Sequence, residues 1–394
     1  MDFERRVLKN GLRVFIERTP VRLCAAYLNL DVGWVNDTIP EISHVFEHMQ
    51  GAGCKVYGKR GALNYAGTNA FADFQNTCFF YHDFFPDDLL KVLKNLSKAL
   101  LRPHVRWLDR EKKAVGRELD ENSCPEAKLD DRIFAILSPK HDKLFSSTKV
   151  SLLNLDRIDV PACCDFFDSF YSPSGAFLYV SGGLNSGLEK GIACFERIKK
   201  GNSVKPVKLP VERVLKRRVE FARKNMEKPF VKIAHQFPGF SGLSLQMNIA
   251  KNFLFNYLNE DFGPLNSRLR DRFGLCYSYA IGSSFTGNCG EVILRVETDV
   301  DNLPLVEKEY LKTLTQIALK GISKEVLDTF RKKYKVLLIK GENQSDLNRV
   351  YNEVARGLHP ADIEQAVAHV TKEDVAYIAR MMLDRGYVVA KGLP

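Results

Sequence analysis

The end of the chain repeats a pattern that also closes its first half. In the first half, Asp159-Val160 opens a helical segment that leads to the apolar stretch 176–180 and Gly182. Near the end, Asp374-Val375 opens another, which leads to Tyr387-Val388-Val389. Each half has roughly 200 residues, enough for a hydrophobic core of its own. We therefore expect an α+β fold of two structurally related halves, each a mostly antiparallel sheet packed with helices.

Local patterns support this plan. Apolar residues alternate over 5–17 around an Asn10-Gly11 turn, which is typical of a β-hairpin, and 25–32 continues with strand composition. After Pro40 the apolar spacing from Glu41 to Met49 becomes helical. The same criteria predict helices at 84–101, 108–121, 158–170, 245–259, 303–318 and 323–339, and strands at 176–180, 230–236 and within 276–298.

Composition changes between the halves. Residues 199–228 are charged and are interrupted by Pro206 and Pro210, as expected for a linker that contributes one strand. The sequence thus predicts an N-terminal domain at 1–200, a linker at 201–228 and a C-terminal domain at 229–394.

Charge and composition exclude several classes of protein. Hydrophobic residues make up 45% and charged residues 27%, which is usual for a folded chain. The net charge is +10, but the densest basic cluster, 216–218 with 223–224, is short and broken, so we expect a solvated linker or strand face. We expect no nucleic acid or membrane surface as a partner, because the sequence has no concentrated positive patch with interleaved aromatic residues. We also expect no membrane span, because no apolar run reaches the roughly 20 residues that a span needs.

The nine cysteines contain no CxxC pair, and we expect reduced thiols. The N-terminus carries Asp2 and Glu4 and lacks the apolar region of a signal peptide. Both observations favour a cytoplasmic location.

Residues 44–48 read His-Val-Phe-Glu-His, the H-x-x-E-H pattern. On a helix, positions i, i+3 and i+4 share one face, so both imidazoles and the Glu47 carboxylate point to one place. Two neutral imidazoles bind Zn²⁺, and a neighbouring carboxylate can act as general base toward water. We therefore predict that His44 and His48 bind zinc and that Glu47 is the base.

A catalytic zinc needs a third protein ligand and an open position. Glu111 and Glu118 lie about two turns apart on the helix predicted at 108–121, so one could bind the metal while the other supports it. Asp120 and Glu121 are alternatives on the same helix.

With these motifs in place, the chain resembles the pitrilysin/insulinase family of zinc metallopeptidases over nearly its whole length, in particular the short processing-peptidase-like members. Residues 8–14 are similar to the family's opening hairpin, and 43–49 to its zinc helix. The resemblance implies one Zn²⁺ per chain, with His44, His48 and Glu118 as ligands. It also implies that Glu111 supports the site from an E-x6-E helix.

The resemblance implies substrate-binding residues as well. Asn69-Ala70, followed by Thr77, is similar to an edge strand that pairs with the substrate backbone, with Asn64 as the nearest rival. Residues 269–277 are similar to a motif in which Arg270 and Tyr277 bind the substrate carbonyl. The alternative is that Arg270 caps a helix and that Tyr277 packs in the core. The chain departs from the family at 50–54, after the zinc helix, and at Gly182-Gly183.

The function implied is a zinc-dependent endopeptidase (metalloprotease) that hydrolyses peptides or unfolded segments in an enclosed chamber. Members of this length resemble half of a clamshell, which implies a dimer: a homodimer, or a heterodimer with a related subunit. The alternatives are a subunit of a heteromeric processing peptidase and a non-catalytic scaffold homologue.

Overall fold

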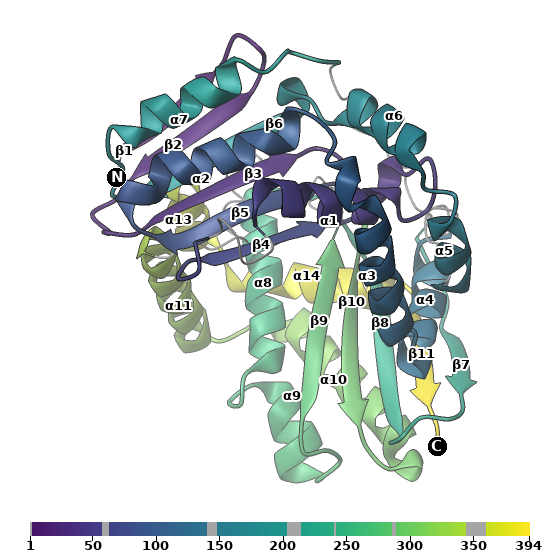
Figure 1. Ribbon diagram of the computed structural model, residues 1–394. Coiled ribbons are helices and arrows are strands. Elements are labelled where there is room, and N and C mark those ends of the chain that lie inside the picture. The colour runs from purple at the N-terminus through teal and green to yellow at the C-terminus, as the bar shows by residue number, and fades with distance from the viewer. Residues whose placement is uncertain are drawn as a thin grey trace. The chain divides into compact units, whose positions relative to one another are not determined.

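The computed structural model describes residues 2–56, 63–139, 148–202, 214–239, 242–285, 289–343 and 360–394. The chain divides into two compact units (Figure 1). The first unit holds the described parts of 1–122, 146–208 and 338–359. The second holds those of 123–145, 209–337 and 360–394, so the segment 123–145 leaves the first half of the sequence and joins the second unit.

The first unit is built on a six-stranded sheet with the order β1-β2-β6-β3-β5-β4. The hairpin predicted around Asn10-Gly11 is confirmed, because β1 and β2 pair antiparallel from Asp2↔Arg18 to Val7↔Arg13. Gly11 has a φ of +90°, which glycine adopts without strain. The strands are β1 (Asp2–Val7), β2 (Arg13–Arg18), β3 (Cys24–Leu30), β4 (Gly67–Ala72), β5 (Thr77–Phe84) and β6 (Ala176–Gly182).

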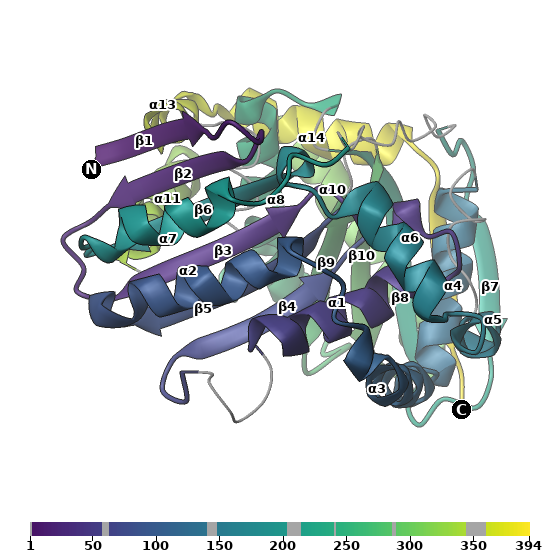
Figure 2. The same ribbon diagram turned by 45° about the horizontal axis from the view of Figure 1, so that its top comes forward.

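Helices cover one face of this sheet. Figures 1 and 2 show α2 and α7 side by side along the strands, and α1 contacts β4, β5 and α3. Alternate residues of β3 belong to different clusters: Ala26 and Leu28 pack into the helix-covered core, and Tyr27 packs with the aromatic residues of the other face. The helices are α1 (Ile42–Cys54), α2 (Leu89–Leu96), α3 (Leu108–Glu121), α5 (Thr148–Leu155), α6 (Val160–Phe170) and α7 (Gly187–Glu196).

The second unit has a five-stranded sheet with the order β7-β11-β8-β10-β9. On β8, His235 lies against Tyr310 of α10, whereas Ala234 belongs to a cluster with apolar residues of α4. The strands are β7 (Val219–Arg223), β8 (Phe230–Pro238), β9 (Tyr279–Phe285), β10 (Cys289–Glu297) and β11 (Tyr387–Gly392). The helices are α4 (Pro125–Leu137), α8 (Leu245–Asn259), α9 (Pro264–Asn266), a π-helical turn (Ser267–Arg272), α10 (Leu303–Lys320), α11 (Lys324–Asn343), α13 (Pro360–His369) and α14 (Lys372–Asp384).

The two sheets share one topology. In each, a strand pairs in parallel with the strand of that sheet that comes last in the sequence, β2 with β6 and β7 with β11. Three further strands then follow in antiparallel register, as β6-β3-β5-β4 and as β11-β8-β10-β9. β1 is the one strand of the first sheet without a counterpart among the described residues. The expected α+β fold of two related, mostly antiparallel halves is confirmed.

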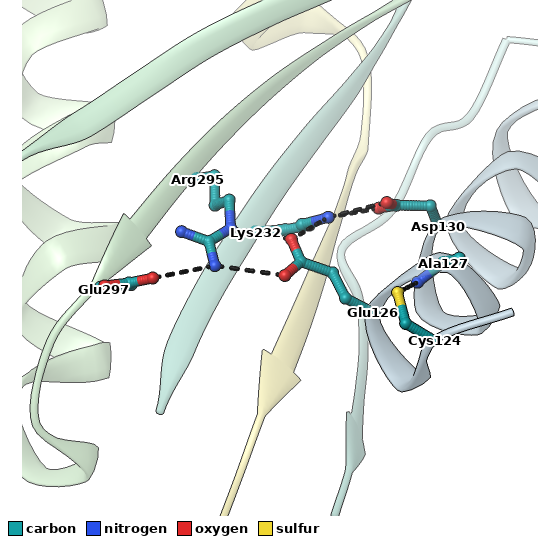
Figure 3. A network of polar contacts seen from close by, with 7 residues as sticks. All are labelled: Cys124, Glu126, Ala127, Asp130, Lys232, Arg295 and Glu297. Atoms are coloured by element: carbon teal, nitrogen blue, oxygen red, sulfur yellow. Dashed lines mark hydrogen bonds and ion pairs between the residues drawn. The ribbon is translucent and has the colours of Figure 1, made fainter. Parts of the chain in front are cut away.

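A network of ion pairs joins α4 to the second sheet (Figure 3). Lys232 of β8 donates to Asp130 at 2.6 Å and pairs with Glu126 at 2.7 Å. Arg295 of β10 donates to Glu126 at 2.8 Å and lies 3.1 Å from Glu297. The network lies beside the apolar residues of α4 that pack on the sheet, so charged and apolar contacts together hold α4 in the second unit.

Most predicted elements are present, with two differences. The zinc helix was expected to end at Met49, but α1 continues to Cys54. The buried Gln50 side chain donates to the carbonyl oxygen of Ala99 at 2.7 Å and accepts from the amide of His104 at 2.9 Å, which explains how this helix can carry a buried polar residue.

The segment 84–101 is α2 flanked by short 3₁₀ turns, Pro86–Asp88 and Ser97–Leu100, instead of one helix. Other short turns are Trp34–Asn36, Val105–Trp107, Pro173–Gly175 and Val300–Asn302.

The structure also bears on the cysteines and on membrane-spanning helices. The eight cysteines whose side chains are described are free thiols. Among the described residues, no helix combines the length and apolar character needed to cross a lipid bilayer.

Candidate metal centre

The helix α1 is fixed at its start by an acidic side chain. The carboxylate of Asp37 accepts hydrogen bonds from the backbone amides of Glu41 at 3.0 Å and Ser43 at 3.2 Å, so it satisfies amides that the helix itself leaves open. Burial raises the pKa of Asp37 to about 7, and the carboxylate's repulsion from Glu41 adds to this effect.

The other face of α1 is anchored in the apolar core. Val45, Phe46 and Met49 are fully buried, and the ring of Phe46 lies 4.6 Å from that of Tyr171. Burying a phenylalanine of this kind stabilises a fold by about 1.5–3 kcal/mol. The apolar face therefore fixes the rotation of α1, and with it the direction of the two histidines.

The structure brings His44, His48 and Glu118 together. One donor atom from each lies within 4.8 Å of the other two. Oε2 of Glu118 is 3.4 Å from Nε2 of His44 and 3.6 Å from Nε2 of His48. The alternatives Asp120 and Glu121 belong to no such cluster among the described residues.

These distances fit a zinc ion. Ligand atoms about 2.1 Å from a tetrahedral zinc are about 3.4 Å from one another, close to the separations found here. Two imidazoles and one carboxylate also form a known donor set of catalytic zinc, which keeps its fourth position for water or substrate. The Glu118 side chain is 46% exposed, so solvent reaches the point where the donors meet.

Glu47 lies beside the donors without belonging to the cluster of three. Its Oε2 atom is 3.6 Å from Nε2 of His48, and its side chain is 4% exposed. A carboxylate in this place can accept a proton from a water molecule near the three donors.

The Nδ1 atom of each histidine contacts an acidic side chain. Nδ1 of His48 lies 3.4 Å from Oε2 of Glu111, and Nδ1 of His44 lies 3.1 Å from Oε2 of Glu41. Glu111 was predicted to support the site. Glu41 was not, although it is an acid directly before the first residue of α1 and only three residues before His44, which is the signal that could have found it.

The charges around His44 affect its protonation. Burial opposes the charged imidazolium, but the hydrogen bond to Glu41 and the charges of Glu41, Glu47 and Glu118 outweigh it, and the pKa of His44 is raised. Burial likewise opposes ionisation of Glu41, but its hydrogen bonds to His44 and Ser151 lower the pKa of this carboxyl. Glu41 is therefore ionised at neutral pH.

The donors line an open cavity of about 580 Å³ in the first unit. Asn69 and Ala70 also line it, and they lie on β4, an edge strand of the sheet. Asn64, the rival to Asn69, does not line the cavity. An edge strand beside a metal centre can accept a peptide as an additional strand.

Arg270 and Tyr277 lie in the second unit, in and after the π-helical turn Ser267–Arg272. The guanidinium carbon of Arg270 lies 5.4 Å from the centroid of the Tyr277 ring. Tyr277 is 86% exposed, so the reading of this residue as a core tyrosine is wrong. Both side chains are accessible to a ligand, which leaves their proposed role in substrate binding as a prediction.

Comparisons with known proteins support a relationship to peptidases. Residues 157–334 match a family model described as "Peptidase M16 inactive domain". The matched segment covers less than half of the chain and does not include α1 or α3, so it supports a relationship to M16 peptidases without testing the metal centre. A search of curated proteins found no match.

Solved structures share the fold over the whole chain. A protease from Helicobacter pylori aligns with a TM-score of 0.83 at 17% identity, covering 100% of this chain and 99% of that chain. A peptidase M16 inactive domain from Pseudomonas fluorescens aligns with a TM-score of 0.81 at 13% identity, with coverages of 100% and 98%. A chain of complex III2 from Candida albicans aligns with a TM-score of 0.77 at 14% identity, with coverages of 99% and 95%. Such low identities show a common fold and leave the activity open.

Proposed function

We propose that this chain is a zinc-dependent endopeptidase that cleaves peptides or unfolded protein segments. The observation that carries the proposal is the convergence of the His44, His48 and Glu118 donor atoms within 4.8 Å, with the carboxylate of Glu47 beside them. The fold that the chain shares with a protease from Helicobacter pylori also supports it.

When bound, zinc would supply Lewis acidity to the scissile carbonyl and to the attacking water. Glu47 would take a proton from that water and deliver it to the leaving amide nitrogen. Asn69 and Ala70 would align the substrate by strand addition along β4. On the resemblance alone, Arg270 and Tyr277 would bind the substrate carbonyl, for which a guanidinium and a phenol are suitable hydrogen-bond donors.

We further propose that the active form is a dimer that encloses a chamber, as a homodimer or with a related subunit. An enclosed chamber would admit flexible peptides and exclude folded proteins. The mass of the native assembly, measured with and without candidate partner chains, distinguishes the two forms.

The test of the proposed function combines metal content with hydrolysis. The purified protein should contain one zinc per chain and should cleave members of a quenched fluorescent peptide library. A chelator should abolish cleavage, and zinc should restore it. A protein that binds no zinc and cleaves no peptide would contradict the proposal.

The second candidate is a non-catalytic homologue that binds a partner. It is favoured by the "inactive domain" description of the matched family and by the likeness to a chain of complex III2. The presence of Glu47 next to a complete set of donors speaks against it, because a scaffold has no need of a general base. Zinc binding without peptide cleavage in any dimeric form would favour this candidate.

A further inference from the structure

The carboxylate of Glu41 connects the metal-binding helix to α5. One of its oxygens lies 3.1 Å from Nδ1 of His44, and the other accepts a hydrogen bond of 2.7 Å from the hydroxyl of Ser151. We propose that Glu41 is a positioning residue for the metal centre, which holds the His44 ring so that Nε2 faces the ion. This inference rests on the proposed zinc site and adds a residue that neither the motif nor the resemblance assigns.

The chemistry of imidazole gives the direction of the effect. A neutral ring carries one proton, on either nitrogen, and only the other nitrogen can bind a metal. An ionised carboxylate can only accept a hydrogen bond, so Nδ1 of His44 must carry the proton when it contacts Glu41. The lone pair is then on Nε2, the atom that lies 3.4 Å from Glu118. Glu41 therefore selects both the tautomer and the ring orientation that metal binding requires.

Glu41 is itself held from two sides. Ser151 is 1% exposed, so its hydrogen bond to Glu41 is protected from water. The backbone amide of Glu41 donates to Asp37 at 3.0 Å. The backbone has a φ of +74°, a left-handed conformation that favours glycine. A glutamate at such a position costs backbone energy, which its side chain contacts must offset.

The arrangement around His48 is equivalent. Glu111 approaches Nδ1 of that ring from α3, whereas Glu41 approaches Nδ1 of His44 from the start of α1. Both rings therefore have a carboxylate behind them and present Nε2 to Glu118. Removal of such a partner commonly weakens metal binding by about 10- to 100-fold, so Glu41 should matter as much as Glu111.

The test measures zinc affinity in the full chain by competition with a chromophoric chelator. E41A should weaken zinc binding by about 10- to 100-fold, and E41Q, which keeps an acceptor for Nδ1, should recover part of the loss. S151A should have a smaller effect, and none when added to E41A, because the hydroxyl acts through Glu41. The visible spectrum of the cobalt-substituted protein should change in E41A. The matched control is D165A, which removes an exposed acid on α6.

Unfolding temperatures measured in excess chelator show whether a variant binds zinc weakly because His44 is misplaced or because the fold itself is less stable. If the unfolding temperature of metal-free E41A is well below that of the wild type, the zinc affinity of E41Q is used as the test instead. Zinc affinities of both E41A and E41Q within about twofold of the wild type would overturn the role of Glu41 and leave the proposed function intact. A wild-type protein that binds no zinc would overturn the proposed function and this inference together.

Discussion

The carboxylate of Glu111 lies 3.4 Å from Nδ1 of His48, while Nε2 of the same ring lies 3.6 Å from the carboxylate of Glu118. Two acids from one helix thus approach the two nitrogens of one imidazole. One would bind the metal and the other would orient the ring, so their substitutions should have different consequences.

For Glu111 we expect a partial loss. E111Q keeps the size of the side chain but removes the charge that holds His48, and it should weaken zinc binding by about 10- to 100-fold. Titration with a competing chelator gives the dissociation constant. Arg110 also pairs with Glu111, so R110A serves as the control for loss of that ion pair. If R110A weakens zinc binding as much as E111Q does, the contact with His48 is not the cause.

Substitutions of Glu47 and Glu118 should distinguish zinc binding from peptide hydrolysis. E47Q should retain stoichiometric zinc and lose peptide hydrolysis, because an amide cannot take the proton. E118A should lose both, because it removes a ligand. Elemental analysis and a fluorescent peptide assay on the same preparations measure the two properties. Wild-type hydrolysis by E47Q would show that the base is a different residue, and full zinc content in E118A would show that another acid is the ligand.

Much of the fold follows from local patterns. The hairpin around Asn10-Gly11 and the helices at 108–121 and 245–259 have short-range signals, and the structure contains them with nearly the expected bounds. The extension of α1 to Cys54 could not be predicted in this way. It depends on contacts of Gln50 with Ala99 and His104, which lie some fifty residues away in the sequence.

Local sequence patterns likewise predict some residues of the candidate site and not others. His44, Glu47 and His48 follow from helical spacing within five residues, whereas Glu118 needed the resemblance to distinguish it from its neighbours on the same helix. Ser151 gave no signal at all, since it reaches Glu41 across 110 residues of sequence. Contacts that depend on tertiary packing leave no local pattern to read.

The ion pairs of α4 should make stability depend on pH. The hydrogen bond from Arg295 lowers the pKa of Glu126 from 4.5 to about 2, and Lys232 adds to the effect. A carboxyl with a lower pKa in the folded state stabilises the fold fully above its unfolded pKa, and this contribution disappears as the pH falls from 4.5 toward 2. Because its side chain is 31% exposed, solvent screening reduces the contribution to about 1–2 kcal/mol.

E126Q lacks this contribution at every pH. Urea unfolding should therefore show E126Q less stable than the wild type at pH 6, with the difference closing as the pH approaches 2. E121Q, which changes an exposed acid at the end of α3, is the control. A difference between E126Q and the wild type that stays constant from pH 6 to pH 3 would argue against the ion pair as its cause.

Two helical glycines should respond in opposite ways to a methyl group. A Cβ on Gly53 would lie 2.0 Å from the ring of His104, so G53A forces that buried ring to move and should destabilise the fold by about 1–3 kcal/mol. A Cβ on Gly116 would meet only Leu155, at 3.4 Å, and G116A should be neutral or stabilising by up to about 1 kcal/mol. Thermal unfolding of both variants tests the pair. Equal effects would show that α1 tolerates closer packing than the structure indicates.

On β9, an edge strand of the second sheet, the backbone groups of Ile281 are bonded to a side chain. Asn259, the last residue of α8, donates to the carbonyl oxygen of Ile281 on β9 at 3.0 Å and accepts from its amide at 2.9 Å. These backbone groups would otherwise be open to pairing with another strand. N259A should therefore associate with itself more strongly than the wild type, as measured by sedimentation over a range of concentrations. N256A, which removes an exposed amide one turn earlier on α8, is the control, and identical behaviour of the two variants would show that Asn259 does not protect this edge.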